Sequence, residues 1–428
     1  KAYEIMVNDK ECLDFLRNKY RYIQVDEYQD TNLIQKDIIY LLAGQDGNLA
    51  VVGDDDQSIY AFRGAKPEIM LNFQKEYPKS KMVKMSTNYR SGKKIISEAD
   101  RVIKSNTNRF QKDFIGFKPE NGAVEYIVTE EKKDEILKIY SRIKKLLNDG
   151  ENPADIAVLF RTNRQAEKMA AILFRNQIPF QSNEKIQSKY EHWMFQDLQA
   201  YYRLANKHLD NKSSDARRDL SRVLNHPNRY LFGYDYIVHG LNRRAMKATV
   251  YAKEKEPWKL NAAEGNIDLF FMLLKNLRGK KPSDFLRSLY SIGKYKKYLE
   301  DYADFRNMEV RDLSSIWKEY QHDASTYNDW VEWGKYIVKY NKELKETLKN
   351  KDGIMLSTMH GSKGLEWKHV FIIDCVEGVC PSPKAETAEE LEEERRLFYV
   401  AMTRAKEHLY LCYYKAEEGK TLTEKGEE

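Results

Sequence analysis

The sequence predicts an α/β protein with a doubly wound parallel sheet that is interrupted by a large helical block. Short runs of β-branched and apolar residues alternate with amphipathic stretches over residues 1–185. Strand patterns then disappear over residues 186–352, and the alternation resumes from Gly353. Strands that alternate with helices of about 10–15 residues favour a parallel sheet, because each parallel connection must cross the face of the sheet.

Each element has a local signature. The predicted strands are short apolar runs, in chain order Tyr22–Val25 (a buried strand), Leu49–Val52, Ala123–Val128, Ile156–Phe160, Ile354–Ser357, His369–Ile373 and His408–Tyr413. The predicted helices are amphipathic and cover approximately residues 31–43, 130–149, 163–176 and 388–402. In the middle block, large side chains recur at helical spacing instead, as in Phe195, Leu198, Tyr201, Tyr202 and Ala205.

Composition excludes several classes of protein. The chain has 428 residues, of which 42% are hydrophobic and 32% charged, enough apolar material for packed cores. Apolar runs such as Ile38–Ala43 fall short of the roughly 18 residues that a membrane span needs, so no membrane partner is expected. Four cysteines without a Cys-x-x-Cys pair predict no disulfide framework or zinc site, and fit a reducing, cytoplasmic location.

The charge is unevenly distributed. The formal net charge is +6, and residues 186–352 alone carry 31 Lys and Arg against 23 Asp and Glu. A basic block favours a polyanionic partner, and a solvated helical surface is the common alternative explanation.

Asp26 and Glu27 directly follow the first predicted strand. An apolar strand that ends in carboxylates is how P-loop NTPases place a Mg²⁺ ligand beside phosphates. The second carboxylate is then placed to polarise an attacking water. The usual alternative is that acids after a strand are ordinary surface residues. Only the rest of the sequence distinguishes this alternative from a Mg²⁺ and water-activating role.

Five sequence motifs in order favour the functional interpretation. They are Val25–Asn32, Val51–Ala65, Asn88–Ser91, Leu356–Glu366 and Glu393–Ala405. Together they resemble motifs II to VI of the superfamily 1 DNA helicases of the UvrD/Rep/PcrA type, over nearly the whole chain. The resemblance implies RecA-like parallel-sheet motor domains of the P-loop NTPase type, the second carrying a large helical insertion.

The resemblance also implies a division into domains. Residues 1–85 would be the C-terminal remainder of the first motor domain, and residues 86–185 with 353–415 the second. Residues 186–352 would be the helical insertion, and residues 416–428 a charged tail.

The resemblance implies an ATP site that needs Mg²⁺. Asp26 would hold the metal, Glu27 would be the general base, and Gln57 would contact the γ-phosphate and the attacking water. An amide carries both a donor and an acceptor, which suits this task, whereas the alternative for Gln57 is an ordinary turn residue.

Four further residues would contact the nucleotide by the same resemblance. Tyr89 would stack on adenine, Glu366 would contact the ribose, and Arg90 and Arg404 would act as arginine fingers. A planar, permanently charged guanidinium suits the charge that spreads over phosphoryl oxygens in the transition state. A solvated or ion-paired arginine is the common alternative, and it applies better to the neighbouring Arg395 and Arg396.

Single-stranded DNA would cross both motor domains. Tyr60, Phe62 and Arg63 match positions where the family stacks bases and grips the backbone, and aromatic stacking tolerates any base. Phe62 replaces the more common Trp and offers a smaller stacking face. Thr358 and His360 match positions that contact the backbone, and a structural hydrogen-bonding role for His360 is an equal alternative.

The helical block resembles the family insertion only at its start. Residues 195–204 and 222–229 match its opening, but Tyr230-Leu231-Phe232-Gly233 replaces the Gly-Ile-Gly turn that touches duplex DNA. The aromatic stripe of the block is predicted to be helical core.

A phosphate-binding loop of the form G-x-x-x-x-G-K-[ST] does not occur in this sequence. The only Gly-Lys-Thr begins at Gly419, but Tyr414 stands where the first glycine is needed. In the family this loop precedes motif II by well over a hundred residues, so we expect it before Lys1. Without it, the chain alone is expected to be inactive in ATP turnover.

The leading prediction is an ATP-dependent, DNA-stimulated 3′→5′ helicase or translocase. Its expected ligands are ATP, Mg²⁺, single-stranded DNA and junctions of single- and double-stranded DNA, and it leaves room for an accessory protein. The alternative is a non-catalytic DNA- or protein-binding module with a retained helicase fold. A helicase–nuclease subunit is a third reading, but no nuclease-like domain follows residue 415.

Overall fold

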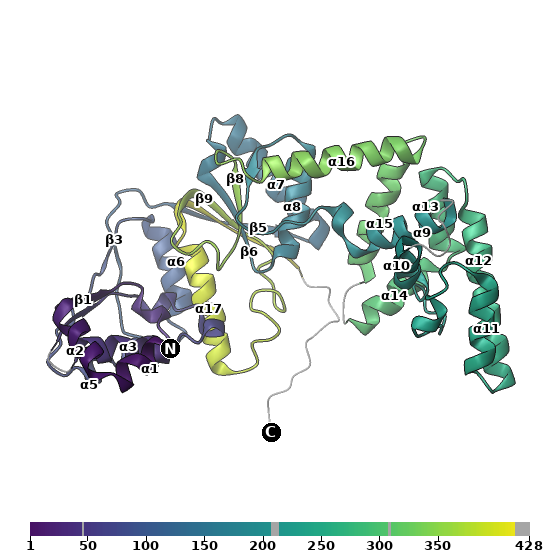
Figure 1. The fold of residues 1–428 in the computed structure, drawn as a ribbon. Coiled ribbons are helices and arrows are strands. Elements are labelled where there is room, and N and C mark those ends of the chain that lie inside the picture. Colours follow the sequence, from purple (N-terminus) through teal and green to yellow (C-terminus); the bar gives the residue numbers. More distant parts are fainter. Residues whose placement is uncertain (45–46, 207–213, 307–309, 416–428) are drawn as a thin grey trace, which may run out of the picture. The chain divides into compact units, whose positions relative to one another are not determined.

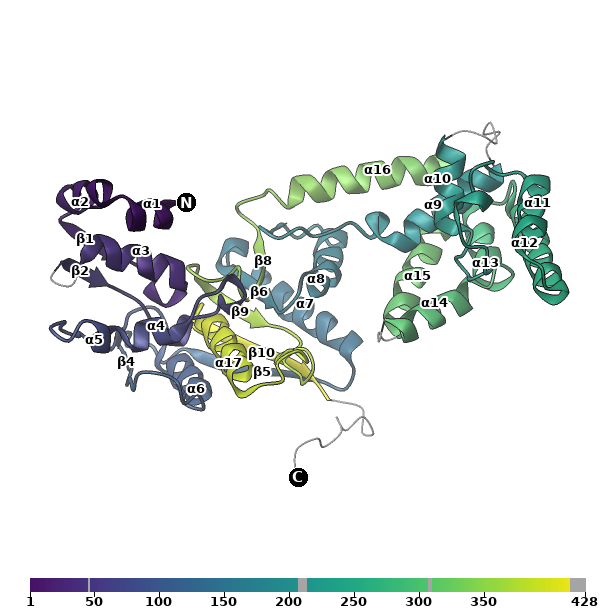
Figure 2. The ribbon, with the colours of Figure 1, turned by 60° about the horizontal axis from the view of Figure 1, so that its bottom comes forward.

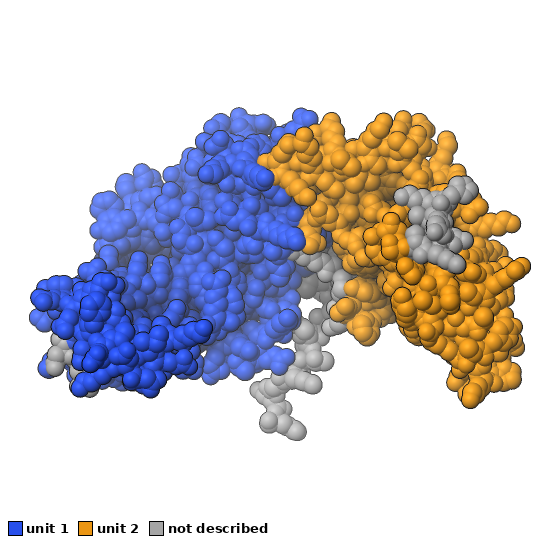
Figure 3. Space-filling model, viewed as in Figure 1, with its two compact units in different colours: residues 1–186, 347–428 blue, residues 187–346 orange. Residues whose placement is uncertain are grey.

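The computed structural model describes the chain except for residues 45–46, 207–213, 307–309 and 416–428. The Gly-Lys-Thr sequence at Gly419 and the predicted charged tail lie outside the described residues. The chain forms two compact units (Figure 3): the first contains Lys1–Ile186 and Thr347–Glu428, and the second contains Gln187–Glu346.

The first unit is built around a six-stranded sheet in which every neighbouring pair is parallel. In spatial order its strands are β5 (Ala123–Thr129), β10 (Ala405–Tyr414), β9 (Trp367–Ile372), β6 (Ile156–Phe160), β8 (Ile354–Thr358) and β7 (Phe180–Gln181). All five residues of β6 are buried. A continuous apolar run of this kind is typical of a strand covered on both faces, so the predicted parallel sheet is confirmed.

Helices cover both faces of this sheet (Figures 1 and 2). On one face α6 (Lys93–Ile103) and α17 (Ala388–Met402) pack together over Ala157 and Leu159 of β6. On the other face lie α7 (Lys132–Asn148) and α8 (Asn163–Arg175). Thr387 and Glu390 form a capping box at the start of α17, which explains why this helix begins where the sequence predicts.

The N-terminal part of the first unit has a separate parallel sheet of two strands, β1 (Tyr22–Val25) and β2 (Asn48–Val51). The helices α1 (Ala2–Asn8), α2 (Lys10–Lys19) and α3 (Leu33–Ala43) accompany it, followed by α4 (Pro67–Leu71) and α5 (Phe73–Glu76). The prediction that Tyr22–Val25 is buried is wrong, since no residue of β1 is fully buried. In a sheet of two strands both strands are edges, so neither is enclosed by neighbours.

Short elements connect the two sheets. The 3₁₀ turns η1 (Tyr28–Asp30), η2 (Asp55–Gln57) and η3 (Ala61–Arg63) follow the N-terminal strands. The strands β3 (Thr87–Asn88) and β4 (Ile115–Gly116) then form a small parallel pair. These turns and the loops beside them carry most of the predicted site residues.

The described residues of the second unit form helices that are joined by turns and loops. Its helices are α9 (Trp193–Asn206), α10 (Ser214–Val223), α11 (Arg243–Lys253), α12 (Pro257–Leu277), α13 (Pro282–Ser291), α14 (Tyr295–Phe305), α15 (Val310–Ser325) and α16 (Trp330–Thr347). Phe195 and Trp333 are buried with ring centroids 5.6 Å apart, and Tyr201 is buried as well. The prediction that the aromatic stripe is helical core is therefore confirmed, whereas Tyr230 and Phe232 are exposed.

Within the described part of the chain, no helix is both long and apolar enough to cross a bilayer.

Candidate nucleotide and nucleic-acid site

The turn after β1 presents Asp26 and Glu27 to solvent. Glu27 has a left-handed backbone with φ of 52°, which costs a non-glycine residue about 1 kcal/mol and must be held by its surroundings. The Glu27 N–H donates to Asp26 Oδ1 at 2.9 Å, and the Glu27 side chain accepts a 2.5 Å hydrogen bond from Gln29 Nε2. The backbone bond is the only one that the Asp26 carboxylate makes to the described residues, so its other oxygen is open to a ligand.

Gln29 links this turn to the segment after β2. It is buried, and its Oε1 accepts from the backbone N–H of Asp54 at 3.0 Å while its Nε2 holds Glu27. A Cβ on Gly53 would lie 2.4 Å from Gln29 Oε1, so this approach requires glycine at position 53. Sequence reasoning quoted Gln29 within a motif but assigned it no role.

Lys363 reaches the same turn from the loop between β8 and β9. Its Nζ donates to Asp30 Oδ2 at 2.6 Å and to the backbone oxygen of Gln57 at 2.9 Å. It also lies 3.4 Å from Glu27 Oε2. Burial raises the pKa of Asp30, and the hydrogen bond from Lys363 opposes this shift. Sequence reasoning assigned no role to Lys363, although this residue lies within the motif Leu356–Glu366.

The side chains of Gln57 and Arg404 contact each other beside Lys363. Arg404, just after the end of α17, is buried and donates from Nε to the Val400 oxygen at 2.9 Å. Its Nη2 lies 3.4 Å from Gln57 Oε1, and Gln57 Nε2 donates to Asp54 Oδ2 at 2.7 Å. Burial, and then the charge of Arg90, lower the pKa of Arg404 to about 10, so it stays charged at neutral pH. The Glu27 carboxylate is close enough to Arg404 to act in the opposite direction.

An adjacent pocket of about 400 Å³ is lined by Asn88, Tyr89, Arg90 and Glu366. Arg90 Nε donates to Glu366 Oε2 at 2.5 Å, and Lys406 Nζ lies 2.9 Å from the other Glu366 oxygen. The hydrogen bonds from Arg90 and Lys406 lower the pKa of Glu366 to about 2. Tyr89 is 62% exposed; its ring packs against Phe117 with centroids 4.8 Å apart, and its exposed surface is available for stacking. The structure thus brings the predicted nucleotide residues Tyr89, Arg90 and Glu366 together in one pocket.

The predicted DNA residues form an aromatic cluster around η3. Phe62 is 68% exposed, and its ring lies edge-on to Tyr60 at 5.8 Å and to His360 at 5.7 Å. The Arg63 guanidinium lies 4.7 Å from the centroid of the Tyr60 ring. Burial, and then the nearby Arg161, lower the pKa of His360 to about 4, so its imidazole is neutral at pH 7.

A second pocket, of about 330 Å³, opens beside this cluster. It is lined by Phe62, Arg161, His360, Glu393, Glu394 and Leu397. Arg161 binds Glu394 with Nη2 to Oε1 at 2.7 Å, and the Ala61 N–H donates to Glu393 at 3.1 Å. Arg161 was missed by sequence reasoning because it follows an ordinary buried strand.

Thr358 has a partner that the sequence did not predict. Its hydroxyl donates to Glu184 Oε1 at 2.5 Å and accepts from the Gly361 N–H at 2.9 Å. The Glu184 carboxylate therefore accepts the hydrogen bond of the hydroxyl that was expected to contact the DNA backbone.

Comparison with known proteins agrees with this geometry. The parallel sheets and the acid-lined strand end define a RecA-like α/β helicase fold. The family model of the UvrD/REP helicase N-terminal domain matches residues 1–78, and that of the UvrD-like helicase C-terminal domain matches residues 83–416. The chain belongs to the UvrD-like helicase family, and the resemblance noted in the sequence is confirmed.

Several curated relatives are similar to the chain along almost all of its length. The Bacillus subtilis protein YjcD is 31% identical over 98% of this chain and 55% of the relative. The ATP-dependent DNA helicase PcrA of Staphylococcus epidermidis is 29% identical over 94% of this chain and 56% of the relative. The ATP-dependent DNA helicase Rep of Buchnera aphidicola is 28% identical over 98% of this chain and 67% of the relative. The chain thus spans a little over half the length of most of these relatives.

Proposed function

We propose that the chain belongs to the motor of an ATP-dependent DNA helicase that moves 3′→5′ on single-stranded DNA. The observation that carries this proposal is the meeting of Gln57 with Arg404 and of Glu27 with Lys363. Acidic and amide groups from the N-terminal matched region face cationic groups from the C-terminal one, which suits a triphosphate bound between them. PcrA and Rep are ATP-dependent DNA helicases, which supports the activity, and the direction of movement rests on the family resemblance.

The domain division remains a proposal. We assign residues 1–85 to the first motor domain, residues 86–185 with 353–415 to the second, and residues 186–352 to the insertion. The two matched regions, which end at residue 78 and begin at residue 83, support a boundary near residue 85.

The turn after β1 suits metal-assisted hydrolysis. Asp26 offers an exposed carboxylate oxygen, and Mg²⁺ is bound by one or two carboxylates together with phosphates and waters. A metal bound there would neutralise charge on the phosphates. Glu27 accepts the proton of the attacking water, and Gln57 orients that water through its amide.

The cationic side stabilises the transition state. Arg90 and Arg404 offset the charge that develops on the γ-phosphoryl oxygens, and Arg404 needs no further desolvation because it is already buried. Tyr89 stacks on the adenine, and Glu366 contacts the ribose while holding Arg90.

The DNA side uses stacking and backbone contacts. Phe62 and Tyr60 stack on successive bases, and Arg63 pairs with a phosphate. We assign hydrogen bonds to the DNA backbone to the neutral imidazole of His360 and to the hydroxyl of Thr358. The Thr358 hydroxyl donates to Glu184 in this structure, so it binds the backbone only when that hydrogen bond is broken.

The test is Glu27→Gln in the full-length protein. It should abolish DNA-stimulated ATP hydrolysis and leave single-stranded DNA binding within about twofold, because the amide cannot take a proton from water. Glu120→Gln, at an exposed loop carboxylate, is the matched control and should retain wild-type turnover. Retained hydrolysis in Glu27→Gln would refute the base assignment. DNA binding without ATP turnover by the wild-type protein would favour the non-catalytic alternative.

A further inference from the structure

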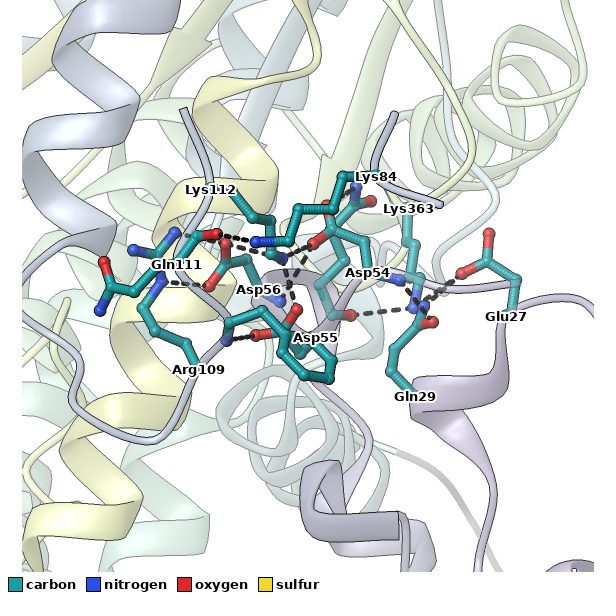
Figure 4. Close-up of polar contacts among 12 residues, drawn as sticks. Glu27, Gln29, Asp54, Asp55, Asp56, Lys84, Arg109, Gln111, Lys112 and Lys363 are labelled. Carbon is teal, nitrogen blue, oxygen red and sulfur yellow. Dashed lines mark hydrogen bonds and ion pairs between the residues drawn. The ribbon is translucent and has the colours of Figure 1, made fainter. Parts of the chain in front are cut away.

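The segment after α6 carries Arg109 and Lys112 and reaches back to the turn of Asp54, Asp55 and Asp56 (Figure 4). The ammonium of Lys112 lies among the carboxylates of Asp54, Asp55 and Asp56, with Asp56 Oδ2 at 3.0 Å and the other two closer. Lys112 belongs to the region matched by the C-terminal family model, and the three aspartates belong to the region matched by the N-terminal one. This contact therefore joins the two matched regions beside the proposed nucleotide site.

The neighbours of Lys112 complete the cluster. Arg109 binds Asp56 through two hydrogen bonds, Nε to Oδ1 at 2.8 Å and Nη2 to Oδ2 at 2.7 Å, and both side chains are buried. The Phe110 N–H donates to Asp55 Oδ2 at 2.8 Å. The three carboxylates lie close enough together to hold a metal ion, but Lys112 and Arg109 already supply the positive charge there.

Lys112 stays protonated in this position. Burial by itself lowers the pKa of Lys112, but the attraction of Asp54, Asp55 and Asp56 outweighs burial and raises the pKa above its ordinary value. The lysine is thus a permanent cation, and its replacement by a neutral residue removes a charge from the centre of three acids.

Asp54 connects Lys112 to Gln57. One carboxylate oxygen of Asp54 takes the hydrogen bond of Lys112, and the other accepts from Gln57 Nε2 at 2.7 Å. Because the amide nitrogen of Gln57 is held in this way, its oxygen points to Arg404, whose Nη2 lies 3.4 Å away. An amide that lost this anchor could turn over and present its donor in place of its acceptor.

We propose that Lys112 is a positioning residue for ATP hydrolysis, which holds Asp54 so that Gln57 keeps its amide oxygen toward Arg404 and the nucleotide. This inference rests on the proposed ATPase function. Lys112 does not touch the reacting atoms in this scheme. It restricts the side chain that orients the attacking water. Outer partners of metal ligands contribute about 10–100-fold to activity, and we expect an effect of that order here.

The first measurement is DNA-stimulated ATP hydrolysis by Lys112→Gln in the full-length protein. We expect kcat to fall about 10–100-fold while KM for ATP and the affinity for single-stranded DNA change less than about twofold. Lys84→Gln is the matched control, since Lys84 Nζ donates to the Gln111 backbone oxygen at 3.0 Å but is not bonded to Asp54. It should retain the wild-type kcat. An unchanged kcat in Lys112→Gln would overturn the inference.

A double-mutant cycle with Gln57→Ala separates positioning from general damage. If Lys112 acts through Gln57, adding Lys112→Gln to Gln57→Ala should lower kcat no further, because the side chain to be positioned is gone. Independent, multiplying losses would mean that Lys112 acts on the fold, and would overturn the inference.

A charge-balanced variant keeps the test decisive if Lys112→Gln alone folds poorly. Lys112→Gln with Asp55→Asn removes one positive and one negative charge together and leaves Asp54 intact, and the amide introduced at position 55 keeps an oxygen for the Phe110 N–H. It should fold with a Tm near that of the wild type and still show the loss of kcat. Wild-type kcat in this folded variant would reject the positioning role while leaving the proposed function standing. Failure of the wild-type protein to hydrolyse ATP would reject the proposed function itself.

Discussion

Lys363 and Asp30 form a partly buried ion pair with Nζ to Oδ2 at 2.6 Å, although 333 positions separate them in the sequence. The pair joins the loop after β8 to the turn after β1, and the same ammonium lies 3.4 Å from Glu27. The proposed general base is thus placed by a lysine from the opposite end of the chain.

Replacing Lys363 by Met should lower the free energy of unfolding by about 1–3 kcal/mol, because Asp30 then loses its cation in a place where burial already raises its pKa. Urea denaturation measures this loss. Lys363→Met with Asp30→Asn should recover part of it, because position 30 then carries no unpaired charge. Lys36→Met, which breaks the more exposed pair with Glu76, should cost about 1 kcal/mol or less. Equal losses in the two single variants would contradict the prediction.

The neutral His360 should make stability depend on pH below 6.5. The unfolded state binds a proton from pH 6.5 downward, whereas the folded state does so only near pH 4, so stability falls as pH drops through this window. His360→Gln should therefore lose less Tm than the wild type between pH 7 and pH 5. His239→Gln, at an exposed position, should follow the wild-type curve. Parallel curves for wild type and His360→Gln would show that His360 is not held neutral.

Glu184 should weaken the binding of single-stranded DNA. Its carboxylate occupies the Thr358 hydroxyl at 2.5 Å and would repel an approaching phosphate. Glu184→Gln should raise the affinity about two- to fivefold at low salt, and the gain should shrink as salt increases. Fluorescence anisotropy with a labelled oligonucleotide measures both the affinity and its dependence on salt. Glu120→Gln is the control for loss of one surface charge. A gain of equal size in the control would assign the effect to net charge alone.

Phe62 should contribute stacking energy to DNA binding. Phe62→Ala should weaken single-stranded DNA binding by about 1–3 kcal/mol, and Phe62→Trp should strengthen it because the stacking face is larger. Phe15→Ala, at an exposed ring on α2, should have no effect. Unchanged affinity in Phe62→Ala would remove this ring from the DNA path.

Much of the fold follows from local patterns. The five apolar residues Ile156–Phe160 predict a strand and form β6 with those bounds. The capping box of Thr387 and Glu390 stops α17 from beginning earlier, and the predicted start at residue 388 agrees with the structure. Burial of β1 was predicted wrongly, because an apolar run does not reveal how many strands flank it.

The contacts within the site were less accessible to sequence reasoning. Lys112, Lys363 and Glu184 look like ordinary surface residues in the sequence, and their partners Asp54, Asp30 and Thr358 are respectively 58, 333 and 174 positions away. No local periodicity encodes such pairs. They form only when strands and loops from distant parts of the chain meet.

The sequence by itself determined the alternation of strands and helices, the helical block and the family, since periodicity, end caps and motif order are properties of short segments. The tertiary structure decided which charges face one another: Lys112 among three aspartates, Lys363 beside Glu27, and Arg404 buried against Gln57. Electrostatic attraction depends on distance and on exclusion of water, and both are set only when the chain has folded.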